Sequence, residues 1–385
     1  MGVRFPKMPL AQHPGMTDAL TGNFHGRPHS PFEKVIFMNM NTNFSRRRFL
    51  GTAATAMVAG GFSSTMNGVA AESAPVNGWT WQPLLKAMYI PPNNLPNLND
   101  AYCEQLKKAG FDGVMVWNWD TTIEEARTMR LMLEKHDLRY HATVRGWLNT
   151  SNPDKEKVAA DIKSGEKALC TAAACGGGSV LLVPDQLGGD RIRGMKMPDP
   201  WDFEIDFDPK TLKVKTVAAG DNTHYADYIK AQNLATECSI RAVEMLIPTA
   251  AKEGVMIGLE NVWNNLWCTP EYFAAFVHSF GSPWVKPHFD LGNHTKYSRC
   301  EEWLKALGRS IVKLDLKDFA VAEFKGKRGG GPGNWAPIGH GTIDWKNVRR
   351  TMEEIRYSGW ISVEATAGNQ TLEEFSRFID EYFGA

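Results

Sequence analysis

Residues 255–260 read Val-Met-Ile-Gly-Leu-Glu, and residues 311–315 read Ile-Val-Lys-Leu-Asp. Each is a short apolar run of β-strand length that finishes on an acid. Comparable runs recur from Trp79 onward, so eight strands are predicted in all. The predicted strands are Leu85–Ile90, Val114–Trp117, Arg139–Val144, Ser179–Val183, Met256–Glu260, Val285–Asp290, Ile311–Asp315 and Trp360–Glu364.

Amphipathic stretches of helical length lie between these runs. The predicted helices include Ala101–Ala109, Ile123–Lys135, Asp154–Ala174, Tyr225–Glu253, Pro270–Phe280, Arg299–Leu307 and Trp345–Ser358. Strands that alternate with helices form a parallel sheet with right-handed crossovers. Eight such units in about 300 residues predict an α/β fold, a closed (β/α)8 TIM barrel. The competing open sheet would carry a G-x-G-x-x-G pattern after its first strand, and this chain has none there.

Two predicted connections are unusually long, residues 184–224 and residues 319–343. Each follows a strand, so each is expected on the face where the carboxyl ends of the strands meet. Loops of this length in a compact fold are usually functional lids or decorations. For 184–224 a small subdomain is the alternative interpretation.

The overall charge excludes some classes of partner. The chain has 43 Lys and Arg residues against 43 Asp and Glu residues, so no strong field attracts nucleic acid or an anionic membrane. Its six cysteines form no C-x-x-C pattern and no cluster with histidine, which argues against a structural zinc site. Their spacing indicates no disulfide pairing.

Residues 1–71 differ from the rest and are excluded from the fold, which is assigned to residues 79–385. Ser45-Arg46-Arg47-Arg48-Phe49-Leu50 leads into an apolar stretch, 51–62, and then small residues at 69–71. This order is typical of a signal peptide, and the paired arginines resemble the twin-arginine export signal of bacteria. The expected location is therefore periplasmic or otherwise extracytoplasmic. The apolar stretch is too short for a stable membrane span, and the alternative is an Arg-rich N-terminal helix.

The last four predicted strands each end in an acid. These four strand-end acids are Glu260, Asp290, Asp315 and Glu364. Successive strand ends of a barrel lie on one rim, where four carboxylates would repel one another unless a cation held them. Oxygen ligands favour Mg2+ or Mn2+, with Co2+ or Zn2+ as alternatives. The competing interpretation for any single acid is a salt bridge on the rim.

The chain resembles the xylose isomerase-like TIM-barrel superfamily of sugar phosphate isomerases and epimerases. The resemblance rests on the motifs Ile-Gly-Leu-Glu260-Asn, Phe-Asp290-Leu-Gly-Asn, Val-Lys-Leu-Asp315-Leu-Lys-Asp, Ile338-Gly-His340-Gly-Thr-Ile-Asp-Trp and Ile-Ser-Val-Glu364. It implies that the four strand-end acids are the ligands of one divalent metal. The chain departs from its relatives in carrying Asp315 where they often have histidine and His340 where they often have glutamate. Asn293, followed by His294, stands where epimerases place a substrate-binding histidine.

The expected reaction is isomerisation or epimerisation of a small carbohydrate through a metal-stabilised enediolate. Glu260 and Glu364 are the predicted catalytic residues, one removing the proton alpha to a carbonyl and the other returning it. The same enediolate can expel a substituent, so a lyase or hydrolase of 3-keto-glycosides is the alternative enzyme. An inactive secreted sugar-binding protein is an alternative of another class. A phosphodiesterase related to endonuclease IV would need a histidine-rich zinc site, which the sequence does not supply.

Four residues near this centre are predicted to bind the substrate, and a structural or merely solvated role is the alternative for each. They are His141, His294, Lys317 and His340. Trp117, Trp147 and Trp263 follow strands and are predicted to form a wall on which a sugar stacks, with ordinary core packing as the alternative. No partner other than the substrate is predicted, and a homo-oligomer is left open.

Overall fold

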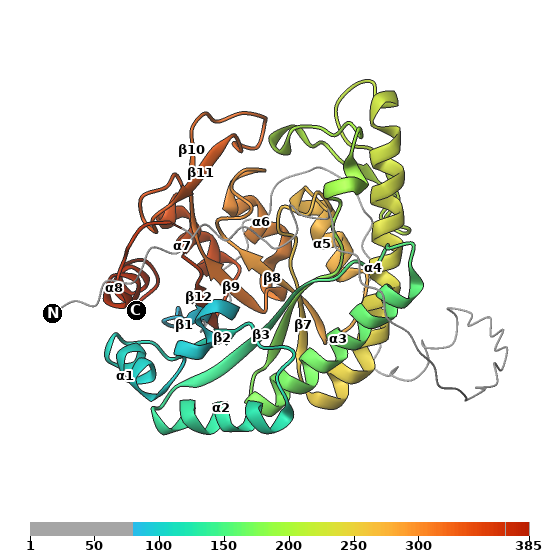
Figure 1. Ribbon diagram of the computed structural model, residues 1–385. Coiled ribbons are helices and arrows are strands. Elements are labelled where there is room, and N and C mark those ends of the chain that lie inside the picture. The colour runs from blue at the N-terminus through green and yellow to red at the C-terminus, as the bar shows by residue number, and fades with distance from the viewer. Residues whose placement is uncertain (1–79, 366, 385) are drawn as a thin grey trace, which may run out of the picture. The chain divides into compact units, whose positions relative to one another are not determined.

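The computed structural model describes residues 80–365 and 367–384, so the predicted signal segment lies outside the described residues. Eight parallel strands close into a barrel with the neighbour order β1-β12-β9-β8-β7-β4-β3-β2 (Figure 1). The strands are β1 (Leu85–Ile90), β2 (Gly113–Val116), β3 (Arg139–Trp147), β4 (Ser179–Val183), β7 (Met256–Leu259), β8 (Val285–Asp290), β9 (Lys313–Leu316) and β12 (Trp360–Val363). The predicted (β/α)8 fold is confirmed.

Eight helices surround the barrel in the described part of the chain (Figure 1). They are α1 (Asp100–Lys108), α2 (Ile123–Lys135), α3 (Lys155–Cys175), α4 (Ala226–Glu253), α5 (Pro270–His278), α6 (Cys300–Leu307), α7 (Trp345–Glu354) and α8 (Leu372–Phe383). None of these helices is long and apolar enough to cross a membrane. All six cysteines are unpaired, and four of them are buried.

The barrel interior has two chemically different halves. On the β2, β3 and β4 side the inward residues form an apolar cluster of their own, which contains Met115, Val144 and Leu181. The inward residues of β8, β9 and β12 are instead polar and buried. They are His288, Asp290, Lys313, Asp315 and Ser362. We call these the apolar half and the charged half.

The polar interior needs room beside β7. Gly258 lies on this strand, and a Cβ atom there would lie 3.2 Å from the Cβ of His288, tighter than a normal packing contact. Glycine therefore allows the imidazole of His288 to enter the interior, where its Nε2 lies 2.8 Å from Oδ2 of Asp315. The small residue on one strand thus makes space for the charged half.

Strand β3 is longer than predicted and irregular. On β2, the consecutive residues Val114 and Met115 pair with Tyr140 and Ala142 of β3. His141 is therefore the extra residue of a β-bulge. A second shift lies between Val144 and Gly146. Bulges bend a strand and change which residues face inward, so the simple alternation of the sequence does not predict the directions of these side chains.

The two long connections carry small hairpins of their own. Residues after β4 form η2 (Gly189–Ile192), η3 (Pro200–Asp202), the strands β5 (Asp206–Phe207) and β6 (Val214–Thr216), and η4 (Thr223–Tyr225). Residues after β9 form an antiparallel pair, β10 (Asp318–Val321) and β11 (Gly333–Ala336). The two connections meet, because Lys327 Nζ lies 2.7 Å from Oε1 of Glu204. The insertion after β4 is thus a structured decoration that is joined to the loop after β9.

Candidate functional site at the carboxyl ends of the strands

Four neighbouring strands bring the strand-end acids to one end of the barrel. Asp290 and Asp315 are direct register partners on β8 and β9. Glu364 follows β12 and donates its backbone N–H to Leu316 of β9, while Glu260 follows β7 and donates to Leu182 of β4. The parallel hydrogen-bonded ladders thus place acids from sequence-distant segments on one rim.

Three of these acids lie close enough to hold one ion. One carboxylate oxygen each of Asp290, Asp315 and Glu364 lies within 4.8 Å of the other two. Glu260 is not a member of this group. Its Oε1 accepts a hydrogen bond of 2.8 Å from the side-chain amide of Asn293, whose backbone N–H also binds Oδ1 of Asp290. Asn293 therefore links the fourth acid to the other three, and a metal contact by Glu260 stays a prediction.

Lys317 lies within this cluster. Its Nζ is 3.0 Å from Oδ2 of Asp290 and 2.9 Å from Oε1 of Glu364. Burial alone would lower the pKa of Lys317, but Asp290, Glu364 and Glu260 hold that pKa well above its ordinary value. The ammonium group is therefore a fixed positive charge in the site.

Lys317 does not satisfy all the carboxylate oxygens. Oδ1 of Asp315 is buried without a hydrogen-bond partner among the described residues, and Oδ2 of Asp290 has the Lys317 ion pair but no well-aligned hydrogen bond. One ammonium group faces four carboxyl groups. Unsatisfied buried carboxylate oxygens are costly, and a hard divalent cation takes oxygen ligands of this type. The residues present therefore fit a divalent cation.

The same crowding changes the acidity of the glutamates. Burial, followed by the charge of Asp290, raises the pKa of Glu260 well above its usual range. Burial raises the pKa of Glu364 to about 7, against the opposing effect of Lys317. A carboxyl group that titrates near neutral pH can both accept and donate a proton, as an acid–base catalyst requires.

Aromatic side chains line the apolar half at the same end of the barrel. Tyr89, Trp117 and Trp147 are partly buried and pack on the interior apolar cluster, together with Val262. Burial, with the charge of Glu364, raises the pKa of the Tyr89 hydroxyl well above its usual value, so the phenol stays neutral beside the acids. Tyr89 was not predicted, although its place near the end of the first strand was a usable signal.

Trp263 contacts the hairpin of β10 and β11 after β9. It stacks on Trp335 of β11, with ring centroids 5.0 Å apart and an angle of 13° between the planes. Its Nε1–H donates to the carbonyl oxygen of Asn293 at 2.7 Å, and Lys296 Nζ lies 3.7 Å from its ring centroid. Trp263 therefore forms a pair with Trp335 beside Asn293, and one wall that joins it to Trp117 and Trp147 stays a prediction.

The loop that carries Trp263 is strained. Trp263, Asn265 and Trp267 all have positive φ angles, of 31°, 56° and 50°, although none is glycine. Such conformations cost roughly 1–3 kcal/mol each and persist where the surroundings impose them. The strain follows directly after Glu260 and is held by contacts to the insertion after β4. It marks this loop as part of the functional end of the barrel.

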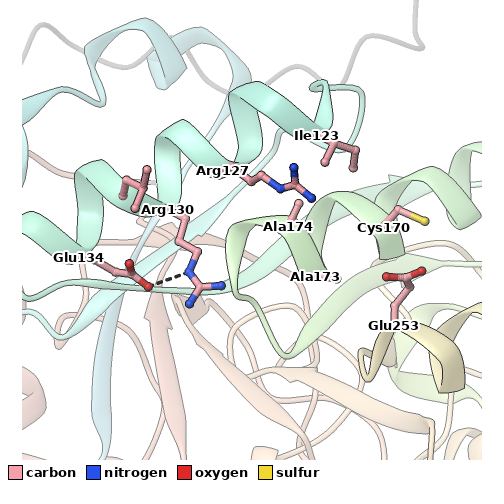
Figure 2. A pocket seen from close by; sticks show the side chains of 9 residues that line it. Ile123, Arg127, Arg130, Glu134, Cys170, Ala173, Ala174 and Glu253 are labelled. Atoms are coloured by element: carbon pink, nitrogen blue, oxygen red, sulfur yellow. Dashed lines mark hydrogen bonds and ion pairs between the residues drawn. The ribbon is translucent and has the colours of Figure 1, made fainter.

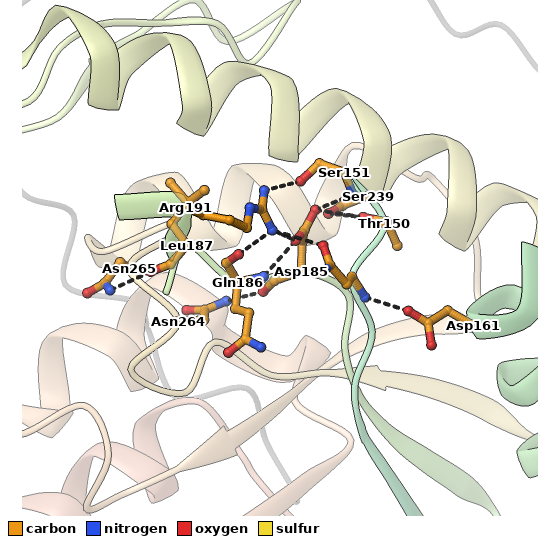
Figure 3. A network of polar contacts seen from close by, with 11 residues as sticks. Thr150, Ser151, Asp161, Asp185, Gln186, Leu187, Arg191, Ser239, Asn264 and Asn265 are labelled. Carbon is orange, nitrogen blue, oxygen red and sulfur yellow. Dashed lines mark hydrogen bonds and ion pairs between the residues drawn. The ribbon is translucent and has the colours of Figure 1, made fainter. Parts of the chain in front are cut away.

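A polar network holds the insertion against the barrel (Figure 3). Asp185 is fully buried after β4, where Oδ1 pairs with Arg191 at 2.7 Å and Oδ2 accepts the backbone N–H of Ser151 at 2.7 Å. Asn264 and Asn265 of the strained loop donate to the carbonyl oxygens of Asp185 and Leu187. The carboxylate after β4 is thus neutralised by arginine and does not join the strand-end acids.

Two predicted substrate-binding histidines form hydrogen bonds with groups other than the four carboxylates. His141 is buried on the bulge of β3, where it stacks on Trp360 at 4.6 Å and contacts Lys313 and Ser362. His294 is buried against Phe289 and Trp303, and its Nδ1 lies 2.7 Å from the carbonyl oxygen of Asp290. Burial lowers the pKa of His294 to about 3, so it stays neutral. Both histidines are placed to position neighbouring side chains and backbone of the barrel. Contact of either histidine with the substrate stays a prediction.

The other two predicted substrate residues differ from each other. Lys317 is in the acid cluster, as described. His340 is exposed in the turn before α7, and its backbone N–H donates to Pro337 at 2.9 Å. Asn293 was missed as a site residue, although its position in the epimerase motif was noted.

A cavity of about 730 Å3 lies elsewhere, on the outer surface (Figure 2). Its lining residues belong mainly to α2 and α3 and none comes from the carboxyl end of a strand. They are Ile123, Arg127, Arg130, Leu131, Glu134, Cys170, Ala173, Ala174 and Glu253. We therefore do not assign this cavity to the strand-end acids.

Solved structures share this architecture. A D-tagatose 3-epimerase-like protein is 16% identical, with a TM-score of 0.56, and the match covers 78% of this chain and 97% of that chain. The zinc-bound IOLI protein is 17% identical, with a TM-score of 0.55 and coverage of 78% and 100%. The apo 3-keto-D-glucoside 4-epimerase from E. coli is 12% identical, with a TM-score of 0.54 and coverage of 77% and 97%. At these identities the likeness shows the fold alone.

The sequence comparisons give one family and no individual relative. The search of curated proteins gives no match. The family described as Xylose isomerase-like TIM barrel matches residues 103–382, which is most of the described barrel and includes all four strand-end acids. The chain therefore belongs to the Xylose isomerase-like TIM barrel family.

Proposed function

We propose that the protein is a metal-dependent carbohydrate isomerase or epimerase that moves a proton alpha to a carbonyl group. The observation that carries this proposal is the convergence of four strand-end acids on one end of the barrel, with raised pKa values at three of them. The structural likeness to a D-tagatose 3-epimerase-like protein and to a 3-keto-D-glucoside 4-epimerase supports the same class of reaction.

Glu260 and Glu364 are the proposed acid–base pair. They follow β7 and β12, which are separated in the barrel by β8 and β9. The two glutamates therefore reach the rim from strands that are not neighbours. The carboxylate of one takes the proton from the carbon, and the bonding electrons move into the carbonyl to form an enediolate. The carboxyl group of the other returns a proton to carbon. Lys317 supplies a positive charge beside the developing oxyanion.

Asp290, Asp315 and Glu364 are the residues that would hold the divalent cation, with Glu260 as the predicted fourth. When bound, the cation polarises the carbonyl as a Lewis acid. Its identity is proposed to be Mn2+ or Mg2+ because the ligands are carboxylates. His288 holds Oδ2 of Asp315 at 2.8 Å and thereby orients this carboxylate from below.

The predicted export signal supports a substrate without a phosphate group. We propose an extracytoplasmic location, where free sugars and oxidised glycosides are more available than sugar phosphates. The aromatic residues Tyr89, Trp117 and Trp147 offer apolar faces for the C–H groups of a sugar ring.

Deuterium exchange tests the proposal directly. The mature chain is loaded with Mn2+ and incubated in D2O with a panel of ketohexoses and methyl 3-keto-β-D-glucoside, and the products are followed by NMR. We expect deuterium at a carbon next to the carbonyl, together with an isomer or epimer. Release of methanol from the 3-keto-glucoside would instead identify the lyase or hydrolase alternative.

Glu260→Gln is the diagnostic variant for this assay, because it keeps the shape and removes the base. The matched control is Glu253→Gln at the end of α4, which is distant from the strand ends. Exchange that persists in Glu260→Gln, or that is absent from the parent with every sugar and metal, contradicts the proposed function.

A further inference from the structure

A second cavity, of about 640 Å3, lies within the insertion after β4. Its walls are mostly apolar and include two methionines, two prolines and two aromatic rings. The lining residues are Met195, Lys196, Met197, Pro198, Asp199, Pro200, Phe203, His224, Tyr225 and Asn265. The volume lies within the usual range of about 300–1,000 Å3 for small-molecule sites.

One lining residue connects this cavity to the loop of the proposed base. Asn265 lies five residues after Glu260 on the strained loop, so their Cα atoms are at most about 18 Å apart even in a fully extended chain. The positive φ angle of Trp263 departs from an extended chain, so the actual separation is below this limit. The side-chain amide of Asn265 donates to the carbonyl oxygen of Leu187 at 2.7 Å, which fixes the loop to the insertion. The cavity therefore belongs to the same end of the barrel as the acids.

The lining predicts the chemistry of its occupant. Phe203 is buried against Tyr228, and Tyr225 packs on the ring of His224 at 3.9 Å, so rigid aromatic surfaces form part of the wall. Methionine side chains are flexible and polarisable, and they adapt to planar apolar groups of different shape. The lining charges, Lys196 and Asp199, oppose each other, so no net charge selects an anion. An aromatic group fits this lining better than a phosphate or a polar sugar ring.

We propose that the cavity in the insertion is a binding subsite for an aryl aglycone, and that the substrates of the enzyme are therefore aryl glycosides whose sugar ring carries a keto group and lies at the strand-end acids. This assignment of substrate class rests on the proposed function. It explains why the long insertion after β4 is fixed to the loop of Glu260 by Asn264 and Asn265.

Methionine NMR tests the subsite without requiring turnover. The full chain, labelled at the methionine methyl carbons, is titrated with 2-naphthyl β-D-glucoside, methyl β-D-glucoside and cellobiose. Resonances are assigned with Met195→Leu and Met197→Leu. We expect the naphthyl glucoside alone to shift the Met195 and Met197 methyls and to leave Met245, which is 59% exposed on α4, unchanged.

Calorimetry adds a matched pair of variants. Burial of an aromatic group predicts binding of the naphthyl glucoside at least about tenfold tighter than the methyl glucoside. We expect Met197→Glu to reduce this ratio to within about twofold, and the control Met245→Glu to retain it. Three results would overturn the aryl subsite. They are equal affinities of the parent for the naphthyl and methyl glucosides, an unchanged affinity ratio in Met197→Glu, and an affinity for cellobiose equal to that for the naphthyl glucoside.

The outcomes separate the two proposals. Methyl shifts at Met195 and Met197 without any sugar turnover would retain the subsite and overturn the proposed function. Deuterium exchange with simple ketoses, without those shifts, would retain the function and overturn the subsite.

Discussion

The two halves of the barrel interior obey the same backbone rules and yet have opposite chemistry. On β2, β3 and β4 the inward positions carry Met115, Val144 and Leu181, which pack together in an apolar cluster. On β8 and β9 the equivalent inward positions carry Asp290 and Asp315, which are equally buried but charged and adjacent in register. The comparison teaches that one parallel barrel can combine an apolar packed side with a side of buried charges, and the latter is where the proposed chemistry lies.

The largest expected effect is on catalysis by the charged half. Glu260→Gln should lower kcat by about 10²–10⁴-fold, the usual contribution of a positioned general base, with a much smaller change in KM. Steady-state kinetics on the substrate found by deuterium exchange measures both constants. A loss no larger than that of the surface control Glu253→Gln would show that the charged half is not catalytic.

Removal of the Lys317 ammonium group should destabilise the metal-free protein. Lys317→Met leaves buried carboxylates uncompensated, and breaking a buried ion pair in this way costs about 3–5 kcal/mol. Chemical denaturation of the metal-free variant measures this loss, and added Mn2+ should restore part of it by binding the folded state. Met115→Leu is the matched change in the apolar half, where we expect less than about 1.5 kcal/mol and no response to Mn2+. Equal responses of the two variants to Mn2+ would contradict the division of the interior.

The raised pKa of Glu364 predicts a specific dependence of stability on pH. The pKa is about 7 in the folded protein, against 4.5 ordinarily, so the folded state retains a proton that the unfolded chain has released between these values. The free energy of unfolding of the metal-free protein should therefore fall as pH rises from about 4.5 to about 7. Glu364→Gln should flatten this slope, whereas the exposed control Glu373→Gln on α8 should not. An unchanged slope in Glu364→Gln would mean that the pKa of this carboxyl group is not raised in the folded protein.

The smallest expected effect belongs to the apolar half. Trp147→Ala removes one of the aromatic faces offered to the sugar and should raise KM about tenfold, or roughly 1.4 kcal/mol, with kcat within about twofold. The exposed Trp263 serves as the comparison, because its ring contacts Trp335 and the Asn293 that holds Glu260. Trp263→Ala should therefore lower kcat more than it raises KM. A kcat effect in Trp147→Ala together with a KM effect in Trp263→Ala would contradict these two assignments.

Much of the fold was predictable because its signal is local. The strands Leu85–Ile90, Ser179–Val183 and Val285–Asp290 agree with the sequence-based bounds residue for residue. The helix α8 was missed, although Thr371 and Glu374 form a capping box at its start. The alternation of strands and helices was enough to predict the barrel fold, because the strand order of the barrel follows from the order of the elements in the chain.

The site was predictable to the level of strand ends and no further. The position of Asp290, Asp315 and Glu364 at strand ends predicts that they lie together, because the barrel rim is a consequence of parallel register. The direction of His141 does not follow from the sequence, because a β-bulge changes the count of residues along β3. The contact of Asn293 with Glu260 does not follow from it either, since the direction of side chains after a strand depends on loop conformation.

The central claim is that acids from neighbouring staves share one divalent cation in the charged half. Crystals of the mature protein grown with Mn2+ and measured for anomalous scattering test it most directly. We predict one strong peak among the carboxylates of Asp290, Asp315 and Glu364, lost in Asp290→Asn. A barrel whose acids bind no Mn2+ at saturating concentration, with Lys317 as their sole counter-charge, would contradict it.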